Sequence, residues 1–444
     1  MARKKFNAVD LFAGAGGLSL GLELAGINVV GSVEYCPKAV KTYEFNFPNH
    51  VAMCKDITKF KPEEMEAELI KQKGITKDEI DIIAGGPPCP GFSNIGRSKI
   101  ISLLREKKWK WKGRPPKEWR HQFVQDPRNK LFLEFVRFVK DFEPRGFVME
   151  NVTGMLTSKN SAGQMVTDLI HNSFDEIGYE CKMKVLHADK LGVPQARKRV
   201  IFIGWKKSSP EDAFSHPIMK EQFAWTSVDA ISDLPFVSQE GGLSQEKHGL
   251  GKNKYQELMR FKAYKDANRI DPRTGKVPQR KTELSCHYGR WVNPRDRAIF
   301  PKLKAPENGK RVTYDQIDPA TLNFPPPWKW DAENRLVRNH KMKSGRNQYK
   351  WYRTDSFKDK IRRIPAHKPC PTLVAHMATD TYMYVHPTED RTLTPQEAAR
   401  IQSFPDSFDF GVVPFTSQYR QIGNAVPPFM AKAIAEEILQ TWNR

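Results

Sequence analysis

The sequence predicts an α/β fold built around a mostly parallel sheet, together with a smaller, irregular domain. Short apolar runs alternate with helical patterns from residue 6 to about residue 205, which is typical of βαβ units. Between about 206 and 390 the alternation stops, in a segment rich in proline, basic and aromatic residues. Helical patterns return over 391–444. We therefore expect a first domain at 1–205, a second at 206–390, and a return segment at 391–444 that completes the first and makes it discontinuous.

The composition indicates a folded protein with an anionic partner. Hydrophobic residues make up 39% of the 444 residues, which is enough for a core. No apolar run reaches the ~18 residues of a membrane helix. The net charge of +21 favours nucleic acid as partner, and a basic face on acidic lipid lacks an amphipathic anchor. Six scattered cysteines without CxxC spacing predict no metal site, no dense disulfide framework and a reducing, cytosolic compartment.

The first elements suggest a cofactor site. A strand predicted at 6–12 is followed by a short helix predicted at 18–25. The turn between them contains Gly14, Gly16 and Gly17. Such a turn lets the backbone approach a ligand closely. Glu34 ends the next strand, where a carboxylate usually binds ribose hydroxyls. After a third apolar piece, Asp56 could meet the amine of an adenine ring and Ile57 could cover its face. A tight turn explains the glycines equally well; a P-loop is excluded because its lysine is missing, and a nicotinamide cofactor stays open.

The most informative stretch is Gly85-Gly86-Pro87-Pro88-Cys89, which follows a strand predicted at 80–84. The two prolines end the strand and stiffen the backbone. Cys89 is therefore either a presented thiol or a buried structural cysteine. The next segment, 97–120, carries ten Lys and Arg against two Glu, with three interleaved tryptophans. This pattern favours a mobile loop along a phosphate backbone over a merely solvated face.

Further polar groups follow later strands. A helix opens near Asp126 with an apolar face from Leu131, and the strand at 146–149 ends at Glu150. Because ligands bind at the carboxyl ends of parallel strands, Cys89 and Glu150 should share one rim. Arg197 and Arg199 enter the apolar strand at 200–204 at alternate positions, so they face the same side and could point at that rim.

With these motifs together, the chain resembles the DNA cytosine-5 methyltransferases over about 1–205 and 391–444. The matching motifs are Asp10–Gly17, Pro87-Pro88-Cys89, Glu150-Asn151-Val152, Gln195–Arg199, Arg391–Gln402 and Gln421–Pro428. The resemblance implies a Rossmann-like sheet of the S-adenosylmethionine-dependent methyltransferase type. It also implies that 206–390 is the target-recognition domain. The loop after Cys89 departs from the family pattern because it is longer and more basic.

The resemblance assigns roles to individual residues. S-adenosylmethionine would contact a set drawn from several motifs: Phe12, Gly14, Gly16, Gly17, Glu34, Tyr35, Asp56, Ile57, Pro88, Leu131, Asn424 and Val426. Cys89 would attack C6 of a flipped-out cytosine, so that C5 can take the methyl group. Glu150 would bind N3 and the exocyclic amine, and Arg197 or Arg199 would contact O2 and a nearby phosphate. The basic loop at 97–120 would be a lid over the base.

The function expected is sequence-specific methylation of double-stranded DNA by a monomer in the bacterial cytoplasm, without membrane contact. A cognate restriction endonuclease would act on the same site without a stable complex, or the enzyme is solitary. Three alternatives remain: an RNA cytosine-5 methyltransferase, a non-catalytic DNA-binding relative and a nicotinamide oxidoreductase. The long middle region argues against the first, intact Cys89 and Glu150 against the second, and Pro-Pro-Cys with Glu-Asn-Val against the third.

Overall fold

A computed structural model describes most of the chain. The described residues are 6–88, 130–160, 163–238, 242–243, 253–262, 284–305, 312, 316–317, 328–330, 335–338, 348–350, 361–379 and 381–443. Cys89 and the segment 97–120 lie outside them, as does the predicted helix start at Asp126. Among the helices in these ranges, none is both long and apolar enough to cross a membrane.

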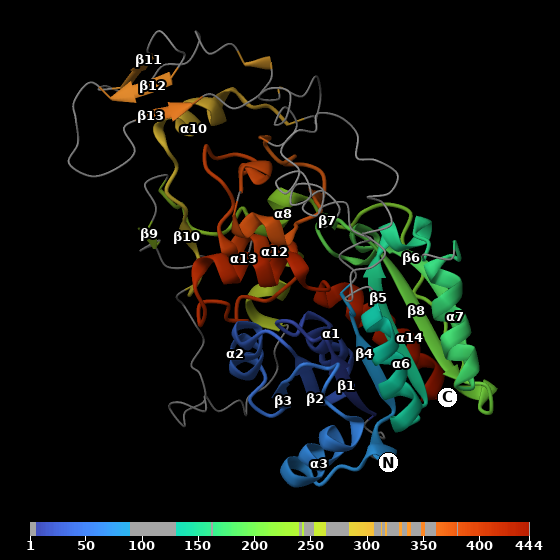
Figure 1. Cartoon of the computed structure of the whole chain (residues 1–444). Coiled ribbons are helices and arrows are strands. Elements are labelled where there is room, and N and C mark those ends of the chain that lie inside the picture. Colours follow the sequence, from blue (N-terminus) through green and yellow to red (C-terminus); the bar gives the residue numbers. More distant parts are fainter. Residues whose placement is uncertain are drawn as a thin grey trace, which may run out of the picture.

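The molecule is organised around a seven-stranded sheet in the order β3-β2-β1-β4-β5-β8-β6 (Figure 1). Its strands are β1 Asn7–Leu11, β2 Asn28–Glu34, β3 Val51–Cys54, β4 Ile82–Gly85, β5 Gly146–Val152, β6 Tyr179–His187 and β8 Lys198–Lys206. The first five are parallel, whereas β8 runs antiparallel to both β5 and β6. The mostly parallel sheet is as predicted, and its order reverses between β1 and β4, where open α/β sheets bind ligands.

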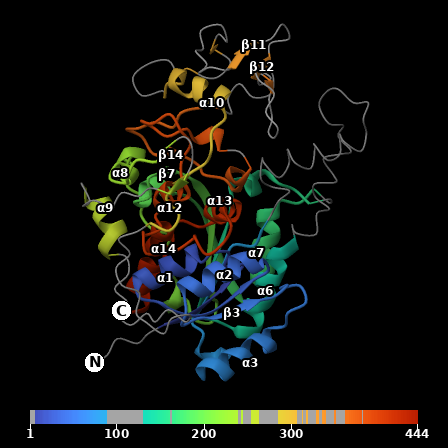
Figure 2. The same ribbon diagram turned by 90° about the vertical axis from the view of Figure 1, so that its left-hand side faces the viewer.

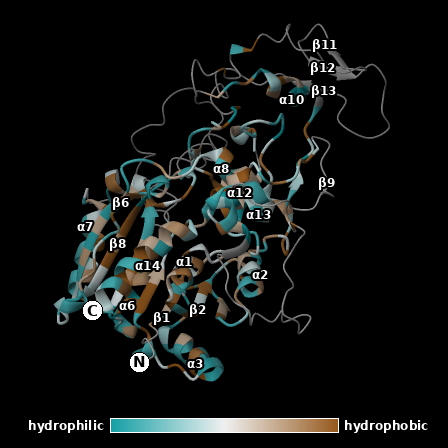
Figure 3. Ribbon diagram, turned by 180° about the vertical axis from the view of Figure 1, so that it is seen from behind, coloured by the Kyte–Doolittle hydropathy of each residue, from teal (hydrophilic) through white to brown (hydrophobic). Residues whose placement is uncertain are grey.

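Helices cover both faces of the sheet (Figure 2). On one face, α3 (Pro62–Lys73), α6 (Leu131–Phe142) and α7 (Val166–Glu176) share an apolar cluster with the strands. On the other face, α1 (Gly17–Ala25) and α14 (Pro428–Trp442) do the same. Figure 3 shows hydrophobic residues gathered on the strands and hydrophilic ones along the outer sides of α3 and α7. The core therefore lies between the sheet and its two helical layers.

The C-terminal helix lies against the first helix of the chain. A Cβ on Gly21 would come within 2.3 Å of Ala431 Cβ, so the small residues allow α1 and α14 to pack closely. The sequence predicts a final helix at about 428–442, and α14 has these bounds. A further apolar cluster joins Tyr43 of α2 (Pro37–Asn46) to Leu373 and Ile401. Apolar packing thus crosses the boundaries expected at 205/206 and 390/391, and the division into domains stays a prediction.

The remaining elements are short, and they build the parts around the sheet. They are β7 Gln195–Ala196, α8 Ser227–Ile231, β9 Gly242–Leu243, α9 Lys254–Glu257, β10 Tyr288–Gly289, α10 Pro294–Ile299, β11 Trp328–Trp330, β12 Arg335–Arg338, β13 Gln348–Lys350, β14 Cys370–Pro371, α12 Pro395–Ile401 and α13 Phe415–Asn424. Two three-residue strands and one of four residues, β11 to β13, form a small antiparallel sheet of their own (Figure 1).

Two strands expected in the second domain are wrong. The apolar runs at 371–376 and 382–385 predict strands, but β14 covers only Cys370–Pro371, and 3₁₀ turns occupy Ala375–Ala378 and Tyr382–Tyr384. Side chains take the backbone groups that a strand ladder would need. The Leu373 N–H donates to Gln195 Oε1 and its carbonyl accepts from Arg197. Tertiary contacts therefore override local β propensity here.

Candidate active site

A cavity of about 900 Å³ opens where the carboxyl ends of the parallel strands meet. Its size suits a small-molecule site. Most predicted site residues in the described part line it: Phe12, Gly14, Glu34, Tyr35, Asp56, Ile57, Pro88, Leu131, Glu150, Arg197, Arg199, Asn424 and Val426. Gly16 and Gly17 do not belong to this lining, and Cys89 lies just beyond the last described residue before it, Pro88. The fold thus brings residues from both ends of the chain to one place.

The turn after β1 holds the carboxylate of Glu34. Phe12 and Gly14 both have positive φ, 60° and 58°, which bends the backbone sharply. The Gly14 N–H donates to Glu34 Oε2 at 2.9 Å, and the Cys36 N–H donates to Oε1 at 2.8 Å. The carboxylate is therefore fixed on the cavity wall, where it can accept from hydroxyl groups of a ligand.

Gly16 and Gly17 serve the packing around the cavity. A Cβ on Gly16, whose φ is 95°, would lie 2.3 Å from the Phe47 ring. A Cβ on Gly17 would lie 2.2 Å from the Val426 carbonyl oxygen. Two glycines in sequence thus let α2 and the segment before α14 close over the turn.

Asp10 is a cavity residue that the sequence analysis did not name as a site residue. It is 1% exposed, its Oδ2 accepts from both the N–H and the Oγ–H of Ser19, and Oδ1 has no partner among the described residues. Burial raises the pKa of Asp10 to about 7. Its signal in the sequence is an acidic residue near the end of the first strand, directly before the glycine turn.

The opposite side of the cavity combines a polar and an apolar group. Asp56 Oδ1 accepts from both the N–H and the Oγ–H of Thr58, which orients the carboxylate. Ile57 is buried, and its carbonyl accepts from Arg137 of α6 at 2.8 Å. Tyr35, which is 73% exposed, lies at the mouth. The arrangement suits a flat ring with an exocyclic amine.

At the other end of the cavity, β5 and β8 bring Glu150 and Arg199 together. Arg199 Nε lies 2.6 Å from Glu150 Oε1, and both side chains are largely buried. The Asn151 Nδ2 donates to the Pro87 carbonyl at 3.1 Å. The strand that carries Glu150 therefore also holds the Pro-Pro turn that precedes Cys89. Pro87 and Glu150 thus lie at one rim, and the place of Cys89 there stays a prediction because it lies outside the described residues.

Arg197 and Arg199 have different surroundings although both line the cavity. Arg197 is 1% exposed and its Nη1 donates to the carbonyls of Leu373 and Gly423, at 3.0 and 3.1 Å. Its Nε has no partner among the described residues. Burial, and then the nearby Arg199, hold the pKa of Arg197 well below its usual range. Arg197 thus ties the cavity wall together, whereas Arg199 pairs with Glu150.

The C-terminal segment contributes more to the cavity than the two predicted residues. Arg420, Gln421 and Gly423 of α13 also line it. Gln421 Nε2 donates to the Lys38 carbonyl of α2 at 2.9 Å, which fixes the end of α13 against α2. The signal that could have identified them is their place directly before Asn424 within one motif.

Comparison with known proteins decides the family. The sequence model described as C-5 cytosine-specific DNA methylase matches residues 6–440. The chain belongs to this family. The resemblance in the motifs is confirmed, and this DNA methylase is an enzyme, a DNA (cytosine-5)-methyltransferase. The oxidoreductase and non-catalytic alternatives are thereby excluded.

Relatives of this methylase extend over nearly its whole length. Type II methyltransferase M.DdeI of Desulfomicrobium norvegicum is 35% identical, covering 97% of this chain and 88% of its own. Type II methyltransferase M.AgeI of Thalassovita gelatinovora is 30% identical, covering 97% of this chain and 99% of its own. A solved structure of a putative DNA modification methyltransferase from an E. coli prophage has a TM-score of 0.60 at 24% identity, covering 99% and 100% of the two chains. The methyltransferase EhMeth of Entamoeba histolytica has 0.50 at 16% identity, covering 100% of both. The predicted fold class is confirmed.

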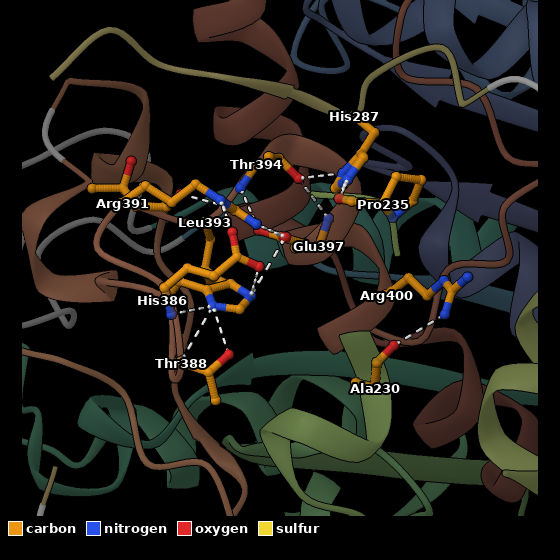
Figure 4. A network of polar contacts seen from close by, with 12 residues as sticks. Ala230, Pro235, His287, His386, Thr388, Arg391, Leu393, Thr394, Glu397 and Arg400 are labelled. Carbon is orange, nitrogen blue, oxygen red and sulfur yellow. Dashed lines mark hydrogen bonds and ion pairs between the residues drawn. The ribbon is translucent and has the colours of Figure 1, made fainter. Parts of the chain in front are cut away.

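In this methylase a buried polar network surrounds the start of α12 (Figure 4). The sequence of 394–397 predicts a capping box with Thr394 as the N-cap and Glu397 closing it, and this prediction is confirmed. Arg391 donates to both oxygens of Glu397, at 2.9 and 2.6 Å. His287 Nδ1 lies 3.0 Å from Thr394 Oγ1, and His386 Nε2 lies 3.6 Å from Glu397 Oε1. The network joins the return segment to parts of the chain from 206–390.

Proposed function

We propose that this methylase transfers a methyl group from S-adenosylmethionine to C5 of a flipped-out cytosine in double-stranded DNA, through a covalent bond between Cys89 and C6. The observation that carries the proposal is the hydrogen bond from Asn151 to the Pro87 carbonyl. It holds the turn before Cys89 beside the strand that presents Glu150. The cavity continues from there to Glu34 and Asp56, so a cofactor and a base can meet inside it.

The residues of the cavity fit the cofactor in charge and shape. The sulfonium and ammonium groups are cationic, and the unpartnered Oδ1 of buried Asp10 offers an acceptor on the wall. Glu34 would accept from the ribose hydroxyls, and Asp56 with Ile57 would take the adenine edge and face. When bound, S-adenosylmethionine supplies an electrophilic methyl group. Phe12, Gly14, Tyr35, Pro88, Leu131, Asn424 and Val426 would complete the enclosure, with Gly16 and Gly17 acting behind it.

The chemistry requires a nucleophile and an acid on the base. The Cys89 thiolate would add to C6 while Glu150, in its protonated form, delivers a proton to N3, so that C5 becomes enamine-like. C5 would then attack the methyl group of the bound cofactor, which would leave as the neutral thioether S-adenosylhomocysteine. A base such as water would then remove H5, and the bond between Cys89 and C6 would break. Arg199, next to Glu150, suits contact with O2, and Arg197 would hold the wall behind it.

The names of the relatives suggest the biological setting. Type II methyltransferases modify DNA within restriction–modification systems, and the proposal places this enzyme in that class. A restriction endonuclease would act on the same site without a stable complex. The methylase would work as a monomer in the bacterial cytoplasm. Because C6 is covered in stacked duplex DNA, the target base must flip, and the basic segment 97–120 would bind phosphates near it.

One experiment tests this function. The protein is incubated with methyl-labelled S-adenosylmethionine and duplex DNA, beside a Cys89→Ser variant and a Cys181→Ser control in which another cysteine, on the far strand β6, is changed. Label should enter DNA with the wild type and the control and be absent with Cys89→Ser. Undiminished label with Cys89→Ser contradicts the covalent route. Label that enters an RNA substrate but no DNA would favour the RNA alternative.

A second measurement examines the covalent intermediate. DNA with 5-fluorocytosine at the target cannot lose a proton from C5, so the adduct with Cys89 should persist. We expect a protein–DNA band that resists detergent, and only in the presence of S-adenosylmethionine. A complex that dissociates in detergent speaks against the intermediate. Bisulfite sequencing of the methylated DNA then identifies the recognition sequence.

A further inference from the structure

Two buried glutamines from distant parts of the chain meet next to the cavity. Gln195 Nε2 donates to Gln402 Oε1 at 2.7 Å, and neither side chain is exposed. Gln195 belongs to β7, and Gln402 follows α12, 207 positions later. Neither residue lines the cavity itself. Their pairing therefore needs an explanation other than ligand contact.

Each glutamine uses its other amide atom to hold backbone. Gln195 Oε1 accepts from the Leu373 N–H at 3.0 Å. Gln402 Nε2 donates to the carbonyls of Ile422 and Ala425, at 2.6 and 3.3 Å. Because a backbone N–H can only donate and a carbonyl can only accept, both amides have one allowed orientation. The result is a directed chain of hydrogen bonds from Leu373 to the end of α13.

One end of this hydrogen-bond chain lies at the proposed cofactor wall, and the other lies on the side proposed for the target base. Ile422 and Ala425 flank the stretch with Gly423, Asn424 and Val426, which forms the cofactor wall. Gln195 lies two positions before Arg197 and four before Arg199, on the side of the base. Arg197 makes a second, parallel link, since it donates to both Leu373 and Gly423. The cofactor wall and the arginine-bearing strand are thus connected at two points.

A purely structural role would be served better by apolar side chains. Burying amides carries a desolvation cost that hydrogen bonds only offset, whereas two methionines of similar length would fill the space without it. Hydrogen bonds add what packing lacks, namely a defined distance and register. We infer that Gln402 is a positioning residue: through Gln195 it sets the segment 422–426 against the segment that carries Arg197 and Arg199, and so aligns cofactor and base. This inference rests on the proposed function.

The test compares Gln402→Met with a matched control, Gln418→Met. Gln418 is also buried and also uses both amide atoms, donating to the Val413 carbonyl at 2.9 Å and accepting from the Tyr288 hydroxyl at 3.0 Å. Its bonds do not reach the cavity wall. We measure Tm, the Kd for S-adenosylmethionine by calorimetry, and kcat with duplex DNA. The Tm should fall by a similar amount in both variants. Gln402→Met should also raise the Kd for S-adenosylmethionine about tenfold and lower kcat, as loss of a buried hydrogen bond implies. Gln418→Met should change neither Kd nor kcat.

Two further variants extend the test. Gln402→Glu keeps the shape of the side chain but cannot donate to Ile422 and Ala425 when ionised. It should therefore weaken cofactor binding and lower kcat at least as much as Gln402→Met. Gln195→Met should reproduce it from the other side, and the double variant should lose no more than one single variant, because the chain is broken once. If Gln402→Met fails to fold, Gln195→Met alone carries the Kd comparison.

Separate results overturn the inference and the proposed function. A folded Gln402→Met or Gln195→Met that binds the cofactor and turns over like the wild type overturns the positioning role, as does an effect equal to that of Gln418→Met. Additive losses in the double variant overturn the coupling between the two glutamines. A wild-type protein that binds no S-adenosylmethionine overturns the proposed function, and the inference with it.

Discussion

Arg199 and Glu150 form an ion pair across two antiparallel strands, with Nε 2.6 Å from Oε1. Arg197, two positions earlier, instead donates to two backbone carbonyls deep in the wall. Of two arginines two positions apart, one thus pairs with Glu150 and the other holds the backbone of the cavity wall. Substitutions at the two arginines should therefore have different consequences.

We expect Arg197→Lys to lower stability and Arg199→Lys to lower activity. A lysine at 197 loses the planar fork that reaches Leu373 and Gly423, which should cost about 2–3 kcal/mol. A lysine at 199 keeps a charge near Glu150 but changes its orientation, and kcat should fall about 10²-fold with little change in Tm. Thermal unfolding and labelled-methyl transfer measure the two effects. Equal Tm losses in both variants would contradict the distinction.

Asn151→Ala should slow the reaction without weakening the binding of the cofactor. Its Nδ2 holds the Pro87 carbonyl, so its loss frees the turn directly before Cys89. For the proposed nucleophile, a small misplacement should cost about 10²-fold in rate. The rate of the 5-fluorocytosine adduct reports this step directly. Asn160→Ala is the control, because the amide of this half-buried residue bonds to Gln164 and not to the Pro87 turn. A variant with wild-type adduct formation would show that the turn is held by other contacts.

Gly17→Ala should weaken binding of S-adenosylmethionine. The added methyl would lie 2.2 Å from the Val426 carbonyl oxygen and must push that segment of the cavity wall outward. We expect a Kd at least tenfold higher, measured by calorimetry. Gly31→Ala is a matched control, because its methyl would meet first the flexible end of the Leu69 side chain, at 2.9 Å. Equal Kd values for the two variants would remove Gly17 from this role.

Asp10 should make the free protein less stable as pH rises from about 4 to about 7. Burial raises its pKa from 3.8 to about 7, so over this range the folded state keeps a proton that the unfolded state releases. The loss is on the order of 4 kcal/mol and is complete above pH 7. Urea unfolding gives the free energy of unfolding of the wild type and of Asp10→Asn at pH 5 and pH 8. The change in this free energy between the two pH values should be smaller in the variant. Asp78→Asn, at an exposed position, should keep the wild-type difference.

Breaking the Arg391–Glu397 pair should destabilise the protein strongly. Both side chains are almost fully buried, so removing one partner leaves an uncompensated charge and should cost about 3–5 kcal/mol. Arg391→Met and Glu397→Gln are compared by urea unfolding with the double variant, which should recover part of the loss. Lys432→Met, at the exposed pair with Glu436, should cost less than about 1 kcal/mol. A small effect of Arg391→Met would mean that neighbouring groups compensate.

Local patterns predicted much of the fold. The strand before the glycine turn, the strand that ends at Glu150 and the helix at 428–442 appear at or near the expected residues. Each is encoded by a short run of residues, and the hydrophobic periodicity of that run indicates whether it forms a strand or a helix. The runs at 371–376 and 382–385 carry the same strand pattern but form 3₁₀ turns. In the first run, the side chains of Gln195 and Arg197 bind the backbone of Leu373. No pattern within those runs contains that information.

The sequence alone determined the order of the elements, the family and the residue types at the site, since each lies in a short motif. Only the tertiary structure decided which partners those residues have. It separated Arg197 from Arg199, placed Asp10 on the cavity wall and joined Asn151 to Pro87, 64 positions earlier, and Gln195 to Gln402, 207 positions later. The physical reason is that a hydrogen bond depends on distance in space, and burial by distant segments decides which polar groups must find a partner.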